Sequence, residues 1–70
     1  MLWLVIQNFD TAQDRLYLKG NSPADYNIGT VNGNVNISTL SGDLVAIVEG
    51  VTSLSQYQQL TNVPNTFLLW

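Results

Sequence analysis

The sequence predicts an all-β domain: a small antiparallel meander of about five to six short strands with one short helical turn segment. Two observations lead to this prediction. Short runs of apolar or alternating residues recur along the chain, and clusters of Gly, Asn, Ser and Asp separate them. The pair Asn32-Gly33 stands between two such runs, and Asn-Gly is the preferred pair of a two-residue hairpin because both residues take positive φ. The whole chain, residues 1–70, is expected to form this single domain.

The first two strands are expected before residue 20. Residues 2–6 form a continuous apolar run, which is typical of a strand buried on both faces. Residues 15–19 alternate between polar and apolar side chains, and the turn signal Gly20-Asn21 follows them. We expect these two strands to pair with each other.

The middle of the chain predicts the meander itself. Residues 26–31, 35–40 and 44–49 are three strand-like runs, and Asn32-Gly33 and Ser41-Gly42-Asp43 separate them. Such spacing favours consecutive antiparallel strands joined by tight turns.

The last third of the chain contains the predicted helical segment and a closing strand. Residues 52–60 are the one stretch with helical spacing, through Leu54, Tyr57 and Leu60, so about one or two helical turns are expected there. Residues 67–70 are Phe-Leu-Leu-Trp, which predicts a final apolar strand.

Charged side chains are scarce in this chain. Hydrophobic residues make up 46% of the 70 residues, charged residues make up 10%, and the formal net charge is -3. Arg15 and Lys19 are the only cations, so the chain cannot neutralise a row of phosphates. The composition therefore argues against nucleic acid as a partner, and the same shortage of cations argues against docking on an anionic membrane.

Most catalytic chemistry lacks its usual residues here. The chain has no His and no Cys, so the commonest general base, the usual zinc ligands and the thiol nucleophile are all missing. No serine stands in a Gly-x-Ser-x-Gly elbow. We therefore expect that the protein is not an enzyme and that it needs no cofactor, with calcium as the one ion to weigh.

Asp10 and Asp14 are the calcium candidates. They bracket one loop together with Asn8, and Ca²⁺ takes its oxygen ligands from such loops. Two carboxylates alone supply too few ligands, so the candidate is a weak one. The alternative, which we favour, is that both aspartates cap the turn by binding its backbone.

Aromatic side chains offer a second alternative to weigh. In a domain of this size large aromatics usually pack in the core, and we expect most of them there. The competing interpretation is a surface on which sugar rings stack. The aromatic residues are Trp3, Phe9, Tyr17, Tyr26, Tyr57, Phe67 and Trp70.

Four segments, taken in order, resemble a known module. They are residues 5–10 (VIQNFD), 14–20 (DRLYLKG), 25–29 (DYNIG) and 44–52 (LVAIVEGVT). This order is similar to the C-terminal flanking module of cyanobacterial hemolysin-type (RTX) calcium-binding proteins. In that module a strand ending in Asp-Phe or Asn-Phe leads to Asp-x-Ile/Leu-x-Leu-x-Gly, and a loop ending in Asp-Tyr follows.

The resemblance implies a β module that ends a secreted parallel β-roll and helps it to fold. It also implies an extracellular location and a position near the C-terminal signal of type I secretion. The chain departs from the family because the calcium-binding nonapeptide repeats, Gly-Gly-x-Gly-x-Asp, are missing.

The resulting functional prediction is a non-enzymatic structural or self-association module that forms a homo-oligomer. The terminal runs are apolar and contain no Lys or Pro to blunt an edge, and no disulfide is available to stabilise a single copy. The candidate contact residues are Leu2, Trp3, Leu4, Phe67, Leu68 and Trp70. The alternative is a small binding module for a neutral polar ligand such as a carbohydrate, held by exposed tyrosines and Asn-rich turns. Those tyrosines are Tyr17, Tyr26 and Tyr57.

Overall fold

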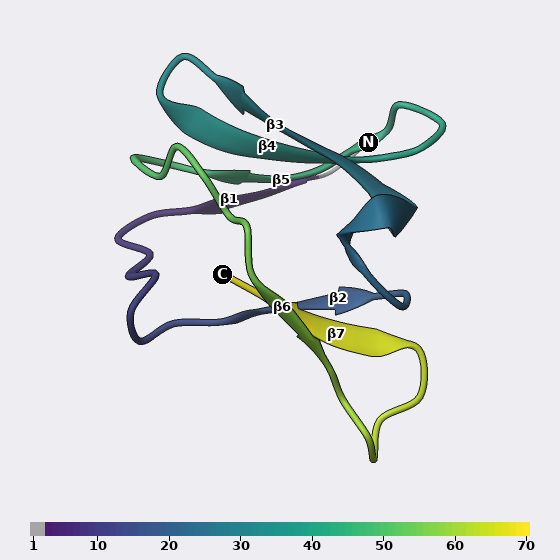
Figure 1. Ribbon diagram of the computed structural model, residues 1–70. Coiled ribbons are helices and arrows are strands. Elements are labelled where there is room, and N and C mark those ends of the chain that lie inside the picture. The colour runs from purple at the N-terminus through teal and green to yellow at the C-terminus, as the bar shows by residue number, and fades with distance from the viewer. Residues whose placement is uncertain (1–2) are drawn as a thin grey trace.

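The computed structural model describes residues 3–70, and Figure 1 shows their path. These residues form seven strands and one 3-10 turn, so the predicted all-β class is confirmed, with slightly more strands than expected. In chain order the elements are β1 (Leu4–Ile6), β2 (Leu16–Lys19), η1 (Pro23–Asp25), β3 (Tyr26–Val31), β4 (Asn34–Thr39), β5 (Leu44–Val48), β6 (Tyr57–Gln59) and β7 (Thr66–Leu69).

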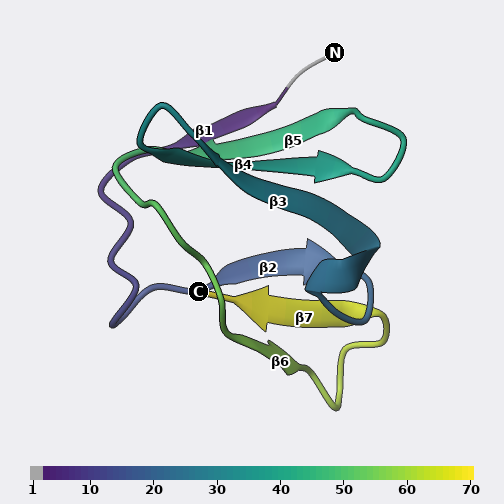
Figure 2. The ribbon, with the colours of Figure 1, turned by 45° about the horizontal axis from the view of Figure 1, so that its top comes forward.

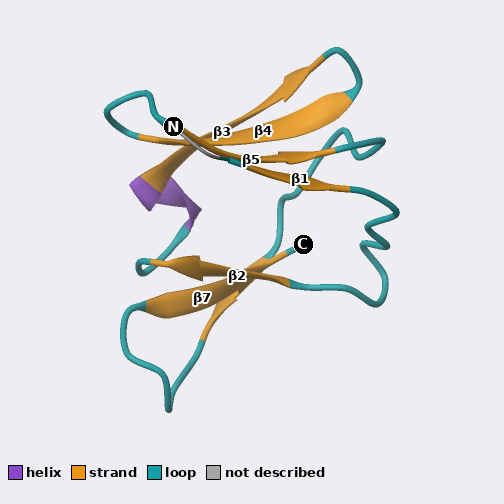
Figure 3. Ribbon diagram, turned by 180° about the vertical axis from the view of Figure 1, so that it is seen from behind, coloured by secondary structure: helices purple, strands orange, loops and turns teal. Residues whose placement is uncertain are grey.

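The strands form two sheets that lie one above the other (Figure 2). The larger sheet has the strand order β1-β5-β4-β3, and the smaller sheet has the order β2-β7-β6. Every strand pair is antiparallel except β1 and β5, which run parallel. Seen from behind, η1 lies at one side between the two layers and the long loop after β1 lies at the other (Figure 3).

The central hairpin forms as its turn chemistry predicts. Asn32 and Gly33 have φ angles of 52° and 80°, and the flanking residues Val31 and Asn34 are paired across the turn. Positive φ at both turn positions matches the twist of the two strands, which is why Asn-Gly suits this place. Strand β5 then pairs with β4, so β3, β4 and β5 form the predicted meander.

The expected pairing of the first two strands is wrong. Strand β1 pairs with β5 in the larger sheet, and β2 pairs with β7 in the smaller one. The physical reason is that Ile6 of β1 and Leu16 and Leu18 of β2 all pack against the common core. Because the core lies between two layers, these residues cover it from opposite sides only when their strands belong to different sheets.

Strand β1 also differs from the expectation that it is buried on both faces. It lies at the edge of the larger sheet, and Trp3, Leu4 and Val5 are exposed. The continuous apolar run therefore marks an edge strand here and not a central one.

The predicted helical turns at residues 52–60 do not form. The chain is extended there and crosses from the larger sheet to the smaller one, where it becomes β6. Gln56 and Trp70 exchange backbone N–H to O hydrogen bonds of 3.2 and 2.9 Å, which continue the ladder between β6 and β7. A helix would leave this edge of β7 unpaired, so pairing with β7 outweighs the local helical pattern.

The hydrophobic core lies between the two sheets. Phe67 and Leu69 of β7 meet side chains of β4 and β5, and Leu54 joins them from the connection before β6. The remaining buried members are Val35, Ile37, Ala46 and Val48. The last strand therefore provides most of the buried surface that the smaller sheet contributes.

Candidate functional site

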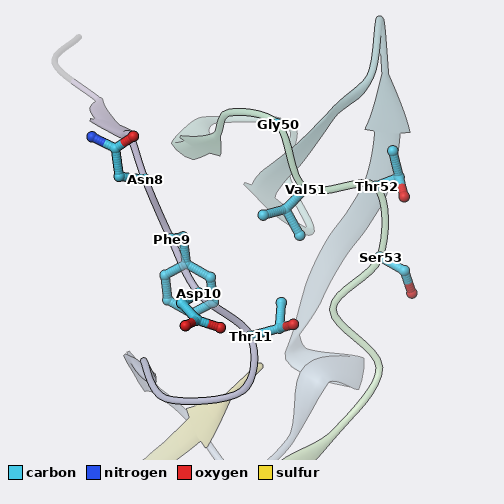
Figure 4. A pocket seen from close by; sticks show the side chains of 8 residues that line it. All are labelled: Asn8, Phe9, Asp10, Thr11, Gly50, Val51, Thr52 and Ser53. Carbon is cyan, nitrogen blue, oxygen red and sulfur yellow. The ribbon is translucent and has the colours of Figure 1, made fainter.

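A surface cleft opens between the loops that follow β1 and β5. Its volume is about 610 Å³. Because β1 and β5 are adjacent and parallel, their carboxyl ends meet at the same edge of the sheet, and binding sites often lie beyond such ends. The residues that line the cleft are Asn8, Phe9, Asp10, Thr11, Gly50, Val51, Thr52 and Ser53 (Figure 4).

The two walls of the cleft differ in character. In Figure 4 the side chain of Val51 points toward the loop of residues 8–11, whereas those of Thr52 and Ser53 point away from it. Phe9 and Val51 pack against the hydrophobic core, so they fix the floor of the cleft. Polar contact with a ligand therefore depends on the residue 8–11 loop and on the main chain of the opposite wall.

Asp10 and Asp14 hold the loop of residues 8–14 in shape. Asp10 Oδ1 accepts a hydrogen bond of 2.9 Å from Ala12 N, and Asp14 Oδ2 accepts one of 2.8 Å from Asp10 N. The carbonyl of Asp10 also accepts a bond of 2.6 Å from Asp14 N. Both side chains bind the backbone of their own turn, which is the role that we favoured from the sequence.

The calcium candidates gain no additional acidic ligands from the fold. Within residues 3–70, His, Cys, Asp and Glu form no group of three or more that is placed to hold a metal ion. Ca²⁺ takes about six to eight oxygen ligands, of which Asp10 and Asp14 supply only a part. Weak calcium binding at this loop stays a prediction.

Hydrogen bonds from side chains to the backbone hold the turn between β2 and β3. Asp25 Oδ2 accepts a hydrogen bond of 2.7 Å from Asn21 N, and the Tyr26 hydroxyl donates one of 2.5 Å to the carbonyl of Lys19. Gly20 has a φ of 125°, and a Cβ at this position would lie 2.8 Å from Asp25 Oδ2. Only glycine fits this backbone beside the carboxylate, so the segment has a structural role.

The fold perturbs the acidity of the Tyr26 hydroxyl. Burial raises the pKa of the Tyr26 hydroxyl above its ordinary value of 10.0, and the neighbouring Asp25 carboxylate raises it further. The neutral hydroxyl is therefore the form that the fold stabilises.

The three tyrosines proposed for sugar stacking do not share a surface. The rings of Tyr26 and Tyr57 each lie 6.1 Å from the ring of Phe67, measured between centroids, so both pack against the core. Tyr17 is on β2 and is 70% exposed. Tyr57 is 49% exposed, but it lies on the opposite face of the smaller sheet from Tyr17, so the three rings form no single platform.

The structure separates the candidate self-association residues into three groups. Trp3 and Leu4 are exposed at β1, whereas Phe67 is completely buried, and Leu68 and Trp70 are half-buried. Leu2 lies outside the described residues. Strand β7 has a partner on both sides, so the expectation of a free apolar edge is corrected for the C-terminal run.

No family model, curated protein or solved structure matches this chain. The resemblance to the RTX flanking module therefore stays a prediction. Its motif residues do come together in part, because residues 8–10 and 50–52 form opposite walls of the cleft. No helix among residues 3–70 has the length and apolar character needed to cross a bilayer.

Sequence reasoning missed the residues of the second wall, Gly50 to Ser53. They are about forty positions away from the first wall along the chain, and the parallel pairing of β1 with β5 that joins the walls has no local signal. The only hint was that residues 8–10 of one wall and 50–52 of the other belong to the segments that resemble the RTX module.

Proposed function

We propose that this domain is a non-enzymatic structural module that self-associates through the edge strand β1. The observation that carries the proposal is the exposure of three successive apolar residues on an edge strand. Leu4 and Val5 of β1 are 62% and 46% exposed, and Trp3, directly before the strand, is 51% exposed. Among residues 3–70, β1 pairs only with β5. Such an edge presents unpaired N–H and C=O groups that form a template for another strand.

Two of the other three sheet edges, β2 and β6, are better protected than β1. Strand β2 ends at Lys19, and Arg15 directly precedes it. Strand β6 is short and carries Gln58 and Gln59. Lysines and polar side chains on short strands are usual devices that prevent edge-to-edge pairing. Strand β1 is as short as β6 but has no charged or polar side chain, whereas the remaining edge, β3, carries Asn27 and Thr30.

The partner that we propose for β1 is β1 of a second copy. A two-fold axis places the same strand on both sides of the contact, and two-fold dimers are the commonest oligomers. The two β1 strands would then run antiparallel and join the four-stranded sheets into one continuous sheet. No charged residue lies on β1, so pairing brings no like charges together.

The resemblance to the RTX module supports a related role for the same edge. In a secreted protein of that type, a module of this kind ends a parallel β-roll, and an unprotected edge strand is where a preceding sheet would continue. The role of a folding cap therefore rests on the same surface as self-association.

Sedimentation at micromolar concentration tests the proposal. We expect a mass of twice 7.7 kDa for the unchanged chain and a folded 7.7 kDa species for Val5→Lys. The matched control is Val31→Lys, because Val31 is 48% exposed at the opposite edge of the same sheet. It should remain dimeric. A folded monomer of the unchanged chain, or equal dissociation in both variants, would contradict the proposal.

A second candidate function is the binding of a neutral polar ligand, such as a carbohydrate, in the cleft beyond β1 and β5. The cleft is lined by the Asn8 amide, the Thr11 hydroxyl and the main chain of the opposite wall, which can exchange hydrogen bonds with sugar hydroxyls. A glycan array followed by NMR titration tests it. Ligand-induced shifts at residues 8–11 and 50–53 would support the site, and shifts elsewhere would contradict it.

A further inference from the structure

The outer face of the smaller sheet carries the positive charge of the molecule. Leu16 and Leu18 of β2 and Leu69 of β7 pack toward the core, so alternation along the strands turns their neighbours outward. The register aligns Tyr17, Leu68 and Gln58 in one row across the three strands. We call this surface the basic face, and its residues are Arg15, Tyr17, Lys19, Leu68, Trp70 and Gln58.

Arg15 is held in a fixed position on this face. Its guanidinium carbon lies 4.0 Å from the centre of a Trp70 ring, which is a cation–π contact. Its Nη1 donates to the carbonyls of Thr11 and Asp14 at 3.2 and 2.8 Å. These contacts orient the guanidinium without neutralising it. Because a guanidinium has five N–H donors, Nε and Nη2 keep donors for an incoming anion.

Four of the five carboxylates accept hydrogen bonds from other groups of the chain, Asp10 from Ala12 N among them. Asp14 accepts from Asp10 N, Asp25 accepts from Asn21 N, and Glu49 accepts from the Gln7 amide. Arg15 and Lys19 are the only cations of a chain with a net charge of -3, and both belong to the basic face. Charge complementarity at this face therefore favours an anionic ligand.

Tyr17 stands between the two cations on one strand. Arg15 and Lys19 are separated by four residues, or about 13 Å at about 3.3 Å per residue. Their charges are therefore too far apart for one small anion to bind both at short range, and an extended ligand is needed. The exposed ring of Tyr17 offers a flat surface at the middle of this span, and the Gln58 amide lies in the same row.

We propose that the basic face binds an acidic oligosaccharide. Its sugar rings stack on Tyr17, and two of its carboxylate or sulfate groups pair with Arg15 and Lys19. Two cations neutralise only two charges, which suits sparsely charged sugars better than nucleic acid, where every nucleotide carries a phosphate. The surface is separate from β1, so this proposal does not depend on self-association.

Titration calorimetry tests the proposal with an oligosaccharide that carries a carboxylate on every second ring, such as a hyaluronan hexasaccharide. A neutral glucose hexasaccharide is the control ligand. We expect the acidic ligand to bind at least about tenfold more tightly, and its affinity to fall as salt is raised because the charges are exposed. Arg15→Gln and Lys19→Gln should each weaken binding about threefold or more. Tyr17→Ser should weaken it to a similar extent.

The matched control for net charge is Leu40→Glu, since Leu40 is exposed in the turn after β4 and the change also lowers the charge by one. It should leave the affinity within about twofold, because salt screens charges on a distant surface. NMR titration of the unchanged chain provides a test that needs no variant, with shifts expected at Tyr17, Leu68 and Gln58. Equal binding of the neutral sugar, shifts confined to other residues, or tighter binding of single-stranded RNA or a glutamate peptide would overturn the proposal.

Discussion

The first and last strands of the domain are both short and apolar, yet they occupy opposite situations. Strand β7 lies between β2 and β6 and places Phe67 and Leu69 in the core. Strand β1 has a single partner and exposes Trp3, Leu4 and Val5. The difference shows that hydrophobicity alone does not decide burial, because the number of neighbouring strands and the extent of the opposite sheet also matter. The two strands therefore differ in their expected roles, because β7 stabilises the single copy and β1 is available to pair with another strand.

The largest expected effect on stability is at β7, the buried strand of the two. Phe67→Ala should lower the free energy of unfolding by about 3–5 kcal/mol, because it removes a completely buried ring and leaves a cavity between the sheets. Urea denaturation followed by tryptophan fluorescence measures the change. A loss below about 1 kcal/mol would show that β7 contributes no more to the core than β1 does.

Gly20 should give the next largest effect, because it anchors the turn beside β7. Its N–H donates to the carbonyl of Asn65 at 2.7 Å, and a Cβ would meet Asp25 Oδ2 at 2.8 Å. Gly20→Ala is expected to cost about 1–3 kcal/mol through a strained backbone and a displaced carboxylate. Gly29→Ala is the matched control, since no atom lies within 4 Å of its added Cβ. Equal melting temperatures for the two variants would contradict the expectation.

A smaller effect is expected at Tyr26, whose ring packs on Phe67. Tyr26→Phe keeps the ring but removes the hydrogen bond to the Lys19 carbonyl, which should cost about 0.5–1.5 kcal/mol at neutral pH. Folding raises the pKa of Tyr26, so its contribution is complete below the ordinary value of 10.0 and is lost as the pH rises through the folded-state pKa. Denaturation curves between pH 8 and pH 11 should therefore converge for the two proteins at the alkaline end. Parallel curves would show that the hydroxyl does not titrate with unfolding.

The smallest effect on the single copy is expected at β1. Trp3→Ser removes an exposed ring, so the free energy of unfolding of a dilute, monomeric sample should change by less than about 0.5 kcal/mol. The same change should weaken self-association measurably in sedimentation experiments. A large loss of stability at high dilution would show that β1 belongs to the core, as β7 does.

Local turn chemistry was the part of the fold that the sequence predicted well. Asn32-Gly33 forms the expected hairpin, and Asp10 and Asp14 bind the turn that they bracket, because each depends on neighbours a few residues away. The pairing of β1 with β5 and of β2 with β7 depends on residues 42 to 53 positions apart, and no short pattern specifies it. The helical spacing at residues 52–60 predicted a helix wrongly for the same reason. This segment instead pairs with the backbone of β7, which is distant in the sequence.

The candidate sites also differ in how far the sequence could predict them. The loop of residues 8–14 was identified from its polar residues, whereas the opposite wall of the cleft and the row of Tyr17, Leu68 and Gln58 exist only once the sheets have formed. Residue types could suggest what a surface recognises, but the register of distant strands decides which residues stand together on it.

The position of β7 has a consequence for the synthesis of the chain on the ribosome. Until residues 66–69 leave the exit tunnel, the apolar inner face of the larger sheet, including Val35, Ile37 and Val48, has no Phe67 or Leu69 to cover it. Neither β2 nor β6 has its only partner before then. The emerging polypeptide therefore exposes the apolar face of this sheet until residues 66–69 have left the tunnel, and folding of the domain is expected to complete only then. A chaperone that holds nascent chains would find its binding site on this temporarily uncovered face.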